Sequence, residues 1–197
     1  MKFTPQNFVK FSCLGHRRLL HIKRYNTTPL AVHESVADHS FFVAVYGWML
    51  HEYLKQFGKE SNLEEILKRA LVHDMEESIS GDIIMTFKHK NPEFANMLHE
   101  LNKGSMDEVL KDLPQDLSKD IKEIWLRSKD ETLEGFIIKA ADKLSLVTYC
   151  IEQLLMGNEY MRPVLHRAIE AIKNFNEPWL NEILHEFLWF LDSKQIE

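Results

Sequence analysis

The residues best suited to chemistry are His73 and Asp74, which stand side by side after the apolar run from Ala70 to Val72. An imidazole and a carboxylate at the end of a buried segment are unfavourable to desolvate unless a cation compensates them. His39 upstream and Asp142 downstream could complete such a site. Two imidazoles and two carboxylates predict an exchangeable divalent ion, namely Co²⁺, Mn²⁺, Fe²⁺, Ni²⁺ or Zn²⁺.

Each of these side chains has a simpler explanation when it is taken alone. A single histidine such as His39 on an apolar helix face is more commonly a hydrogen-bonded core residue. Asp142 could form a structural salt bridge with Lys139 or Lys143, which lie off its helix face but could reach it by snorkelling. The metal prediction therefore depends on the four residues together. An ion with four protein ligands and a preference for five or six keeps room for water, which is typical of a catalytic site.

Helices are predicted to position all four residues. A helix over residues 35–57, ended by Gly58, carries His39 within its apolar stripe. Asn62 is the predicted N-cap of a second helix, which ends at the His73-Asp74 pair. A long helix over residues 132–156 places Asp142 on an inward face with three other residues: Ile138, Ser145 and Tyr149.

The rest of the chain is also predicted to be helical, apart from a basic, irregular loop over residues 16–33. Asn91 starts another helix, and Ser105 with Glu108 has the spacing of a capping box, which predicts that a new helix begins there. The last helix is predicted to have Asn176 as its N-cap.

The composition favours one compact all-α domain over residues 1–197. Seven Gly and six Pro in 197 residues are too few for a turn-rich β-sandwich, and no segment resembles a linker. A net charge of −6 argues against a nucleic-acid polymer as the main partner, although a single basic residue beside a metal can still bind a small phosphate ester.

No membrane partner is expected, and the protein is predicted to be cytoplasmic. The longest uncharged stretch, over residues 39–51, is shorter than the roughly 18 to 20 residues that a membrane span needs. Residues 1–11 lack the pattern of a signal peptide. Cys13 and Cys150 have no CxxC pairing and are predicted to be reduced thiols.

The order of the four predicted ligands resembles that of the HD-domain metal-dependent phosphohydrolases, an all-α family defined by His, His-Asp and Asp. More narrowly, the chain resembles the 5′-deoxyribonucleotidase branch over about residues 20 to 160. The motifs of that branch occur here in order: Arg24-Tyr25, Val36 to Ser40, His73 to Glu77, Gly81-Asp82 and Ala141-Asp142. Two departures bear on base selectivity, since Tyr25 replaces the usual Trp and no proline follows Gly81-Asp82.

The resemblance implies a metal-dependent phosphomonoesterase that hydrolyses (deoxy)ribonucleoside 5′-monophosphates to nucleoside and phosphate. Glu77 would be the catalytic proton shuttle, one helical turn from His73. Asp82 would hydrogen-bond the substrate or the attacking water, and Asp74 would also lie against the substrate. The alternatives are a solvent-facing carboxylate for Glu77 and a turn-stabilising role for Asp82.

The substrate phosphate would be bound by Arg24 through charge-assisted hydrogen bonds, with the ring of Tyr25 against the nucleoside. Arg17 and Arg18 compete with Arg24 for this role, because spacing alone does not separate them. Eight other histidines have no partner at ligand spacing and are predicted to be ordinary loop or surface residues: His16, His21, His33, His51, His89, His99, His166 and His185.

Two other function classes stay open on the sequence. One is a different HD phosphohydrolase, acting on guanosine tetraphosphate or a dinucleoside polyphosphate. The other is a non-catalytic helical interaction module in which the metal is a structural staple. The family resemblance implies a homodimer, and the C-terminal aromatic residues could pack against a symmetric partner: Trp179, Phe187, Trp189 and Phe190.

Overall fold

The computed structural model describes residues 3–14, 16–83 and 91–194. Regular secondary structure in these residues is helical, apart from one isolated antiparallel bridge between Lys23 and Ser35. The prediction of an all-α protein is therefore confirmed. No helix within the described ranges combines the length and the apolar character that crossing a membrane requires.

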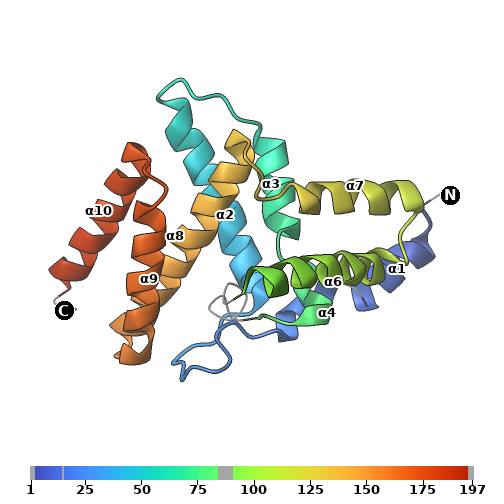
Figure 1. Cartoon of the computed structure of the whole chain (residues 1–197), viewed down its shortest axis with the longest axis horizontal. Helices are drawn as coiled ribbons and strands as arrows, with labels where there is room; N and C mark the ends of the chain where they lie inside the picture. The colour runs from blue at the N-terminus through green and yellow to red at the C-terminus, as the bar shows by residue number, and fades with distance from the viewer. Residues whose placement is uncertain (1–2, 15, 84–90, 195–197) are drawn as a thin grey trace.

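Three helices pack against one another at the centre of the molecule: α2 (Val36–Lys55), α3 (Leu63–Val72) and α8 (Leu133–Leu155). On one side of them lie α9 (Arg162–Lys173) and α10 (Pro178–Ser193), as Figure 1 shows. The other side holds α1 (Pro5–Leu14), α6 (Pro92–Leu110) and α7 (Gln115–Leu126). Short helical segments complete the described chain: η1 (His16–His21), α4 (Glu77–Ser80) and η2 (Glu159–Met161).

Side-chain caps fix the beginnings of the three central helices. Ser35 and Asp38 form a capping box at the start of α2, in which the Ser35 hydroxyl accepts from the Asp38 amide at 3.2 Å. Asn62 caps α3 as predicted, and Thr132 caps α8. Gly58 has a φ of 70° just after α2, a left-handed conformation that favours glycine. These local signals explain why the predicted boundaries of these helices are close to those of the structure.

Two clusters of buried apolar side chains meet at the end of α3. The larger cluster joins α2, α3, α8, α9 and α10, and it includes Ile66 and Ala70. The smaller cluster joins the end of α3 to α6 and α7, and it includes Val72 and Met75. The His73-Asp74 pair lies in the sequence between Val72 and Met75 of the smaller cluster and shortly after Ala70 of the larger one, so packing on both sides of the pair holds this turn in place.

Three local predictions differ from the structure. No helix begins at Ser105, because α6 continues through it and the Ser105 hydroxyl donates to the Leu101 carbonyl at 3.3 Å. Asn176 has a φ of 55° and lies before the N-cap of α10, which is Glu177. The predicted loop over residues 16–33 begins with the short 3₁₀ helix η1.

Candidate metal centre

The first imidazole of the site comes from the second turn of α2. His39 is fully buried, and its Nδ1 lies 3.2 Å from the Ser145 hydroxyl on α8. Burial, together with the charge of Arg24, outweighs the effect of Asp142 and lowers the pKa of His39 to about 3. His39 is therefore a neutral imidazole, which is the form that binds metals.

The second imidazole comes from the C-cap of α3. His73 is 4% exposed, and its Nδ1 lies 2.7 Å from the carbonyl oxygen of Ala70. A carbonyl oxygen only accepts, so Nδ1 carries the hydrogen and the Nε2 atom of the neutral ring carries the lone pair. A hydrogen bond of this kind on the far nitrogen is the usual way in which a metal-binding histidine is oriented.

Carboxylates lie directly opposite these two rings. Asp74 Oδ2 is 3.1 Å from His73 Nε2 and 3.8 Å from His39 Nε2, while Asp142 Oδ1 is 3.2 Å from His39 Nε2. Ligand atoms of His39, His73 and Asp74 all lie within 4.8 Å of one another. Asp142 joins this group through its contact with His39. The structure thus brings together the four side chains that the sequence singled out.

The two Nε2 atoms show that this arrangement fits a cation. Among the residues that the structure describes, neither buried Nε2 makes a hydrogen bond, so we assign the hydrogen of His39 to Nδ1, which donates to Ser145. In the neutral rings both lone pairs then face carboxylate oxygens at little more than 3 Å. Such contacts are repulsive unless a cation lies between the groups, and a divalent ion with nitrogen and oxygen ligands satisfies all of them.

The cationic groups around the site keep both carboxylates ionised. Burial raises the pKa of Asp142, but the nearby charges of Lys129 and Lys143 hold it well below its usual range. Burial likewise raises the pKa of Asp74, but its contact with the His73 ring and the charge of Lys129 reverse this and hold the pKa well below its usual range. Both carboxylates are therefore available as anionic ligands at neutral pH.

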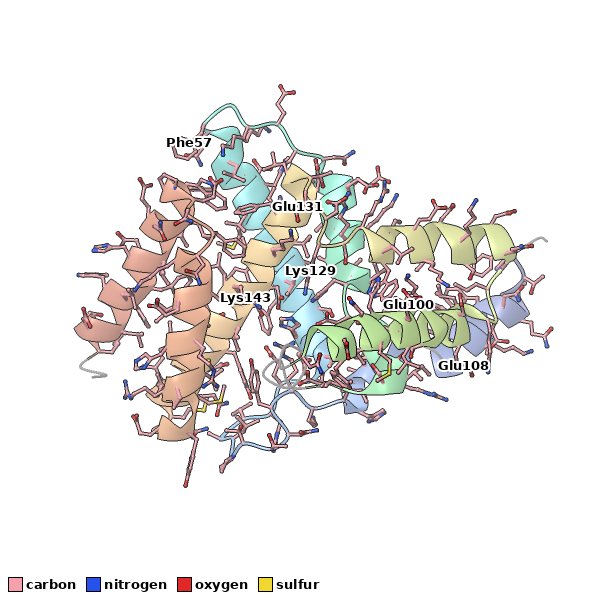
Figure 2. The ribbon with its side chains drawn as sticks, in the orientation of Figure 1. Phe57, Glu100, Glu108, Lys129, Glu131 and Lys143 are labelled. Atoms are coloured by element: carbon pink, nitrogen blue, oxygen red, sulfur yellow. The ribbon has the colours of Figure 1, made fainter. Side chains whose placement is uncertain are left out.

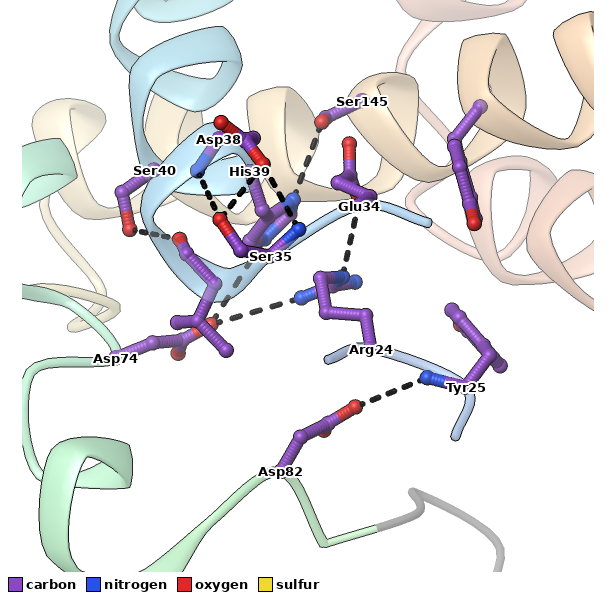
Figure 3. Close-up of polar contacts among 12 residues, drawn as sticks. Arg24, Tyr25, Glu34, Ser35, Asp38, His39, Ser40, Asp74, Asp82 and Ser145 are labelled. Atoms are coloured by element: carbon purple, nitrogen blue, oxygen red, sulfur yellow. Dashed lines mark hydrogen bonds and ion pairs between the residues drawn. The ribbon is translucent and has the colours of Figure 1, made fainter. Parts of the chain in front are cut away.

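Arg24 lies beside the four residues and is itself held by an acidic partner. It is 8% exposed, its Nε is 3.1 Å from Glu34 Oε2, and its Nη1 is 3.8 Å from Asp74 Oδ2 (Figure 3). Arg17 and Arg18, which the sequence could not separate from Arg24, are exposed residues of η1. Of the three arginines, Arg24 is the one that pairs with a residue of the centre.

Tyr25 and Asp82 approach the site from two loops. Tyr25 has a φ of 53°, which is rare for an aromatic residue, and its backbone amide donates to Asp82 Oδ2 at 3.3 Å (Figure 3). Its ring stacks near that of Tyr149, with centroids 6.4 Å apart. Asp82 thus stabilises the turn that follows Arg24, across 57 residues of sequence.

Glu77 is buried at the start of α4, only 3% exposed. Its neighbour Glu76 is 6% exposed and accepts a hydrogen bond from Trp125 Nε1 at 2.7 Å, which ties it to α7. The solvent-facing alternative for Glu77 is therefore wrong. A carboxylate kept from water four residues after His73 is suited to handling protons in a closed site.

Lys129 and Glu34 are two residues of the site that sequence reasoning missed. The ammonium of Lys129 lies 2.9 Å from Asp142 Oδ2, and Glu34 holds Arg24. Lys143 also reaches Asp142 Oδ2, at 3.6 Å, as one of the predicted alternatives allowed, whereas Lys139 pairs with Glu131. Neither missed residue lies in an apolar stripe, so neither carries a local sign of burial.

Comparison with known proteins gives one consistent family. Residues 12–190 match the family model described as 5′-deoxynucleotidase YfbR-like. A 5′-deoxynucleotidase of Photorhabdus laumondii is 35% identical over 174 residues, which cover 86% of this chain and 88% of that protein.

Solved structures agree with this result. The crystal structure of an HD-domain phosphohydrolase from Listeria innocua aligns with a TM-score of 0.78 and 26% identity, covering 93% of this chain and 88% of that one. A conserved protein from Pyrococcus furiosus aligns with a TM-score of 0.73 and 30% identity, covering 91% and 98%. These likenesses extend over nearly the whole chain.

Proposed function

The chain belongs to the YfbR-like 5′-deoxynucleotidase family, and on that premise we propose that it hydrolyses (deoxy)ribonucleoside 5′-monophosphates to nucleoside and phosphate. It is a phosphohydrolase of the HD-domain type. The observation that carries the proposal is the cluster of two buried imidazole lone pairs with the Asp74 carboxylate, with Asp142 in contact with His39 and the guanidinium of Arg24 beside Asp74.

In this proposal His39, His73, Asp74 and Asp142 hold one divalent ion. When bound, such an ion supplies Lewis acidity, which polarises the phosphoryl group and lowers the pKa of the attacking water. HD phosphohydrolases are metal-dependent. The donor set of two nitrogens and two carboxylates supports Co²⁺, Mn²⁺, Fe²⁺, Ni²⁺ or Zn²⁺ as the ion, and it does not resemble a thiolate-bound structural zinc site.

The chain's own residues then bind the substrate and transfer the proton. Arg24 binds the nonbridging phosphate oxygens, and Asp74 borders the bound phosphate beside it. Glu77 takes a proton from the attacking water as the oxygen bonds to phosphorus, and it returns a proton to the 5′-oxygen as the P–O5′ bond breaks. Asp82 fixes the backbone of Tyr25, whose ring packs against the nucleoside. The charged groups of the substrate phosphate and of these residues meet in a largely buried site, where electrostatic stabilisation of the transition state is strong.

Residues 1–197 are proposed to act as a single domain, because the ion's ligands come from α2, α8 and the turn after α3. We place the protein in the cytoplasm. The two cysteines support this placement, since Cys13 is an exposed free thiol and Cys150 a buried one, as expected in a reducing compartment.

A homodimer is proposed through the groove that α2, α8 and α10 line. The groove has a volume of about 670 Å³, and six of its lining residues are apolar or aromatic side chains of α2 and α10: Phe42, Tyr46, Ile183, Phe187, Trp189 and Phe190. Trp189 is 62% exposed and Phe42 is 45% exposed. A second copy of the same surface would bury these rings, and Trp189→Asp should convert the dimer to a monomer in sedimentation velocity.

The function is tested by phosphate release from a panel of 2′-deoxyribo- and ribonucleoside 5′-monophosphates, with guanosine tetraphosphate as a comparison. The purified chain is assayed with Mn²⁺, Co²⁺ or Zn²⁺ and again with excess chelator. We expect release from the monophosphates that the chelator abolishes and His39→Ala lacks. Release that survives the chelator, or none with any of the ions, would contradict the proposal.

A further inference from the structure

We propose that Lys129 is a second cationic residue that binds the substrate phosphate, beside Arg24; this inference rests on the proposed function. Lys129 lies in the segment between α7 and α8. Its Nζ is 2.9 Å from Asp142 Oδ2 and 3.8 Å from Asp74 Oδ1, so it contacts both ligand carboxylates. The side chain is 34% exposed, which leaves the ammonium within reach of a molecule that enters from solvent.

The lysine approaches the carboxylates through different oxygens from those that face the imidazoles. Asp74 Oδ2 and Asp142 Oδ1 are the atoms closest to the two rings. Lys129 contacts the other oxygen of each residue, Asp74 Oδ1 and Asp142 Oδ2. Lys129 therefore leaves the oxygens of the candidate metal centre available and does not occupy the position of the ion.

The balance of charge around the candidate metal centre indicates that Lys129 binds an anion. The two carboxylates carry two negative charges, which one divalent ion would neutralise. The charge of Lys129 would then lack a full counterpart among the ligands, and an ammonium partly withdrawn from water is unfavourable without an anion. A phosphate monoester carries up to two negative charges and supplies that anion. Arg24 and Lys129 each lie 3.8 Å from Asp74, at Oδ2 and Oδ1 respectively, so an anion bound beside Asp74 can meet both cations.

The backbone around Lys129 is fixed to the helix that supplies His73. Arg69 of α3 donates to Asp130 Oδ1 at 2.9 Å and to the Thr132 hydroxyl at 3.0 Å. Gly135 permits this packing, because a Cβ there would lie 2.5 Å from the carbonyl oxygen of Asp130. Such anchoring holds a binding side chain in register with the ligands.

Lys143 fits the role less well. It contacts only Asp142 Oδ2, at 3.6 Å, whereas Lys129 reaches both carboxylates. Figure 2 shows the two lysines near each other at the centre of the molecule, beside α8. Asp142 thus keeps a cationic neighbour when Lys129 is replaced, so the substitution tests phosphate binding with the carboxylate still paired.

The test is the binding of inorganic phosphate to the cobalt-loaded full chain, measured by calorimetry. Lys129→Met removes the charge at similar length, Lys129→Arg keeps the charge, and Lys139→Met is the matched control, because Lys139 pairs with Glu131 at 2.7 Å. We expect the phosphate dissociation constant to rise about tenfold or more in Lys129→Met, with the cobalt content unchanged. Lys129→Arg should recover most of the affinity, and Lys139→Met should match the wild type.

Two results would overturn the inference. If Lys129→Met binds phosphate as tightly as the wild type, Lys129 does not bind the phosphate. If it loses cobalt, Lys129 serves to hold the ligands. Lys129→Gln carries the same test should the Met variant fail to fold. Because this experiment measures the binding of inorganic phosphate, neither result decides whether the protein hydrolyses nucleotides. That question is tested separately by phosphate release by the wild-type chain.

Discussion

Replacing Arg24 by Met is expected to weaken substrate binding and to leave the metal centre in place. The guanidinium of Arg24 lies between two carboxylates, with Nε 3.1 Å from Glu34 and Nη1 3.8 Å from Asp74. Glu34 orients the side chain, so the edge near Asp74 is the one that can bind phosphate. A methionine of similar length fills the space but supplies no hydrogen bond and no charge.

The expected loss follows from the kind of interaction removed. Charge-assisted hydrogen bonds contribute about 1.5–3 kcal/mol, which corresponds to a fall of roughly 10- to 150-fold in kcat/KM. Stability should change less. Burial raises the pKa of Glu34 to about 7 even though Arg24 opposes this, so removing Arg24 raises this pKa further and favours the protonated group over an unpaired anion. The protonation of Glu34 should therefore add only about 1 kcal/mol of destabilisation.

The assay is steady-state phosphate release at pH 7.5 by Arg24→Met and by the double variant with Glu34→Gln. Both should show a KM at least about tenfold above the wild type, with kcat affected less. Thermal denaturation should show the double variant to be no less stable than the single one. The exposed Arg17 provides the control, since Arg17→Met should leave KM unchanged. A KM within twofold of the wild type for Arg24→Met, or an equal rise for Arg17→Met, would show that Arg24 does not bind the substrate phosphate.

Three further predictions concern the acid–base residues and the core. Glu77→Gln should reduce kcat by about 10²- to 10⁴-fold with metal content retained, and turnover at the wild-type rate would remove Glu77 from the proton transfer. The pKa of Glu34 in the folded protein, about 7, lies above its ordinary value of 4.5, so the unfolded chain loses this proton first as the pH rises. The free energy of unfolding of the metal-free wild-type protein should therefore fall by up to about 3 kcal/mol relative to that of Glu34→Gln between pH 4.5 and 7. Parallel pH profiles of the two proteins in urea denaturation would contradict this. Gly47→Ala should destabilise the protein by about 1 kcal/mol, because the new Cβ would lie 2.8 Å from Ile66 Cγ2. Gly104 faces open space, so Gly104→Ala should stabilise α6 by about 0.5–1 kcal/mol. Changes of the same sign in chemical denaturation would contradict the difference in packing at the two positions.

The central helices were predictable because their signals are local. Asn62 bonds the amide of Glu65, three residues away, so a short window of sequence contains the whole interaction. The same kind of signal failed at Ser105, where capping-box spacing occurs inside a continuous helix. The Ser105 hydroxyl finds an acceptor at Leu101 within α6, and the helix continues through Gly104 and Ser105. Spacing alone does not show which of the two hydrogen bonds a serine makes.

The candidate ligands were predictable for a different reason. His39 and Asp142 are polar residues within apolar helical stripes, and His73 with Asp74 ends such a stripe, so their burial is visible in the sequence. Lys129 has no such sign, because it lies in a connection between helices. Its contact with Asp74 joins residues that are far apart in the sequence, and only the packing of α3 against α8 brings them together.

Glu34 was missed on similar grounds. It precedes the capping serine of α2 and looks like a solvated loop residue, yet it is 6% exposed and pairs with Arg24 across an antiparallel bridge. The backbone amide of Arg24 donates to the Glu34 carbonyl at 3.0 Å, which sets the two side chains next to each other. An isolated bridge of this kind leaves no alternating pattern in the sequence from which a strand could be predicted.

The most direct test of the account is the metal content of the purified chain. After dialysis against chelator, wild-type protein and single variants are reloaded with Co²⁺ or Zn²⁺, freed of excess ion and measured by elemental analysis. One ion per chain is expected for the wild type, none for His73→Ala, and one for His185→Ala, whose side chain is 78% exposed. A wild-type chain that retains no ion, or a His73→Ala variant that retains as much as the wild type, would contradict the assignment of this site as a metal centre.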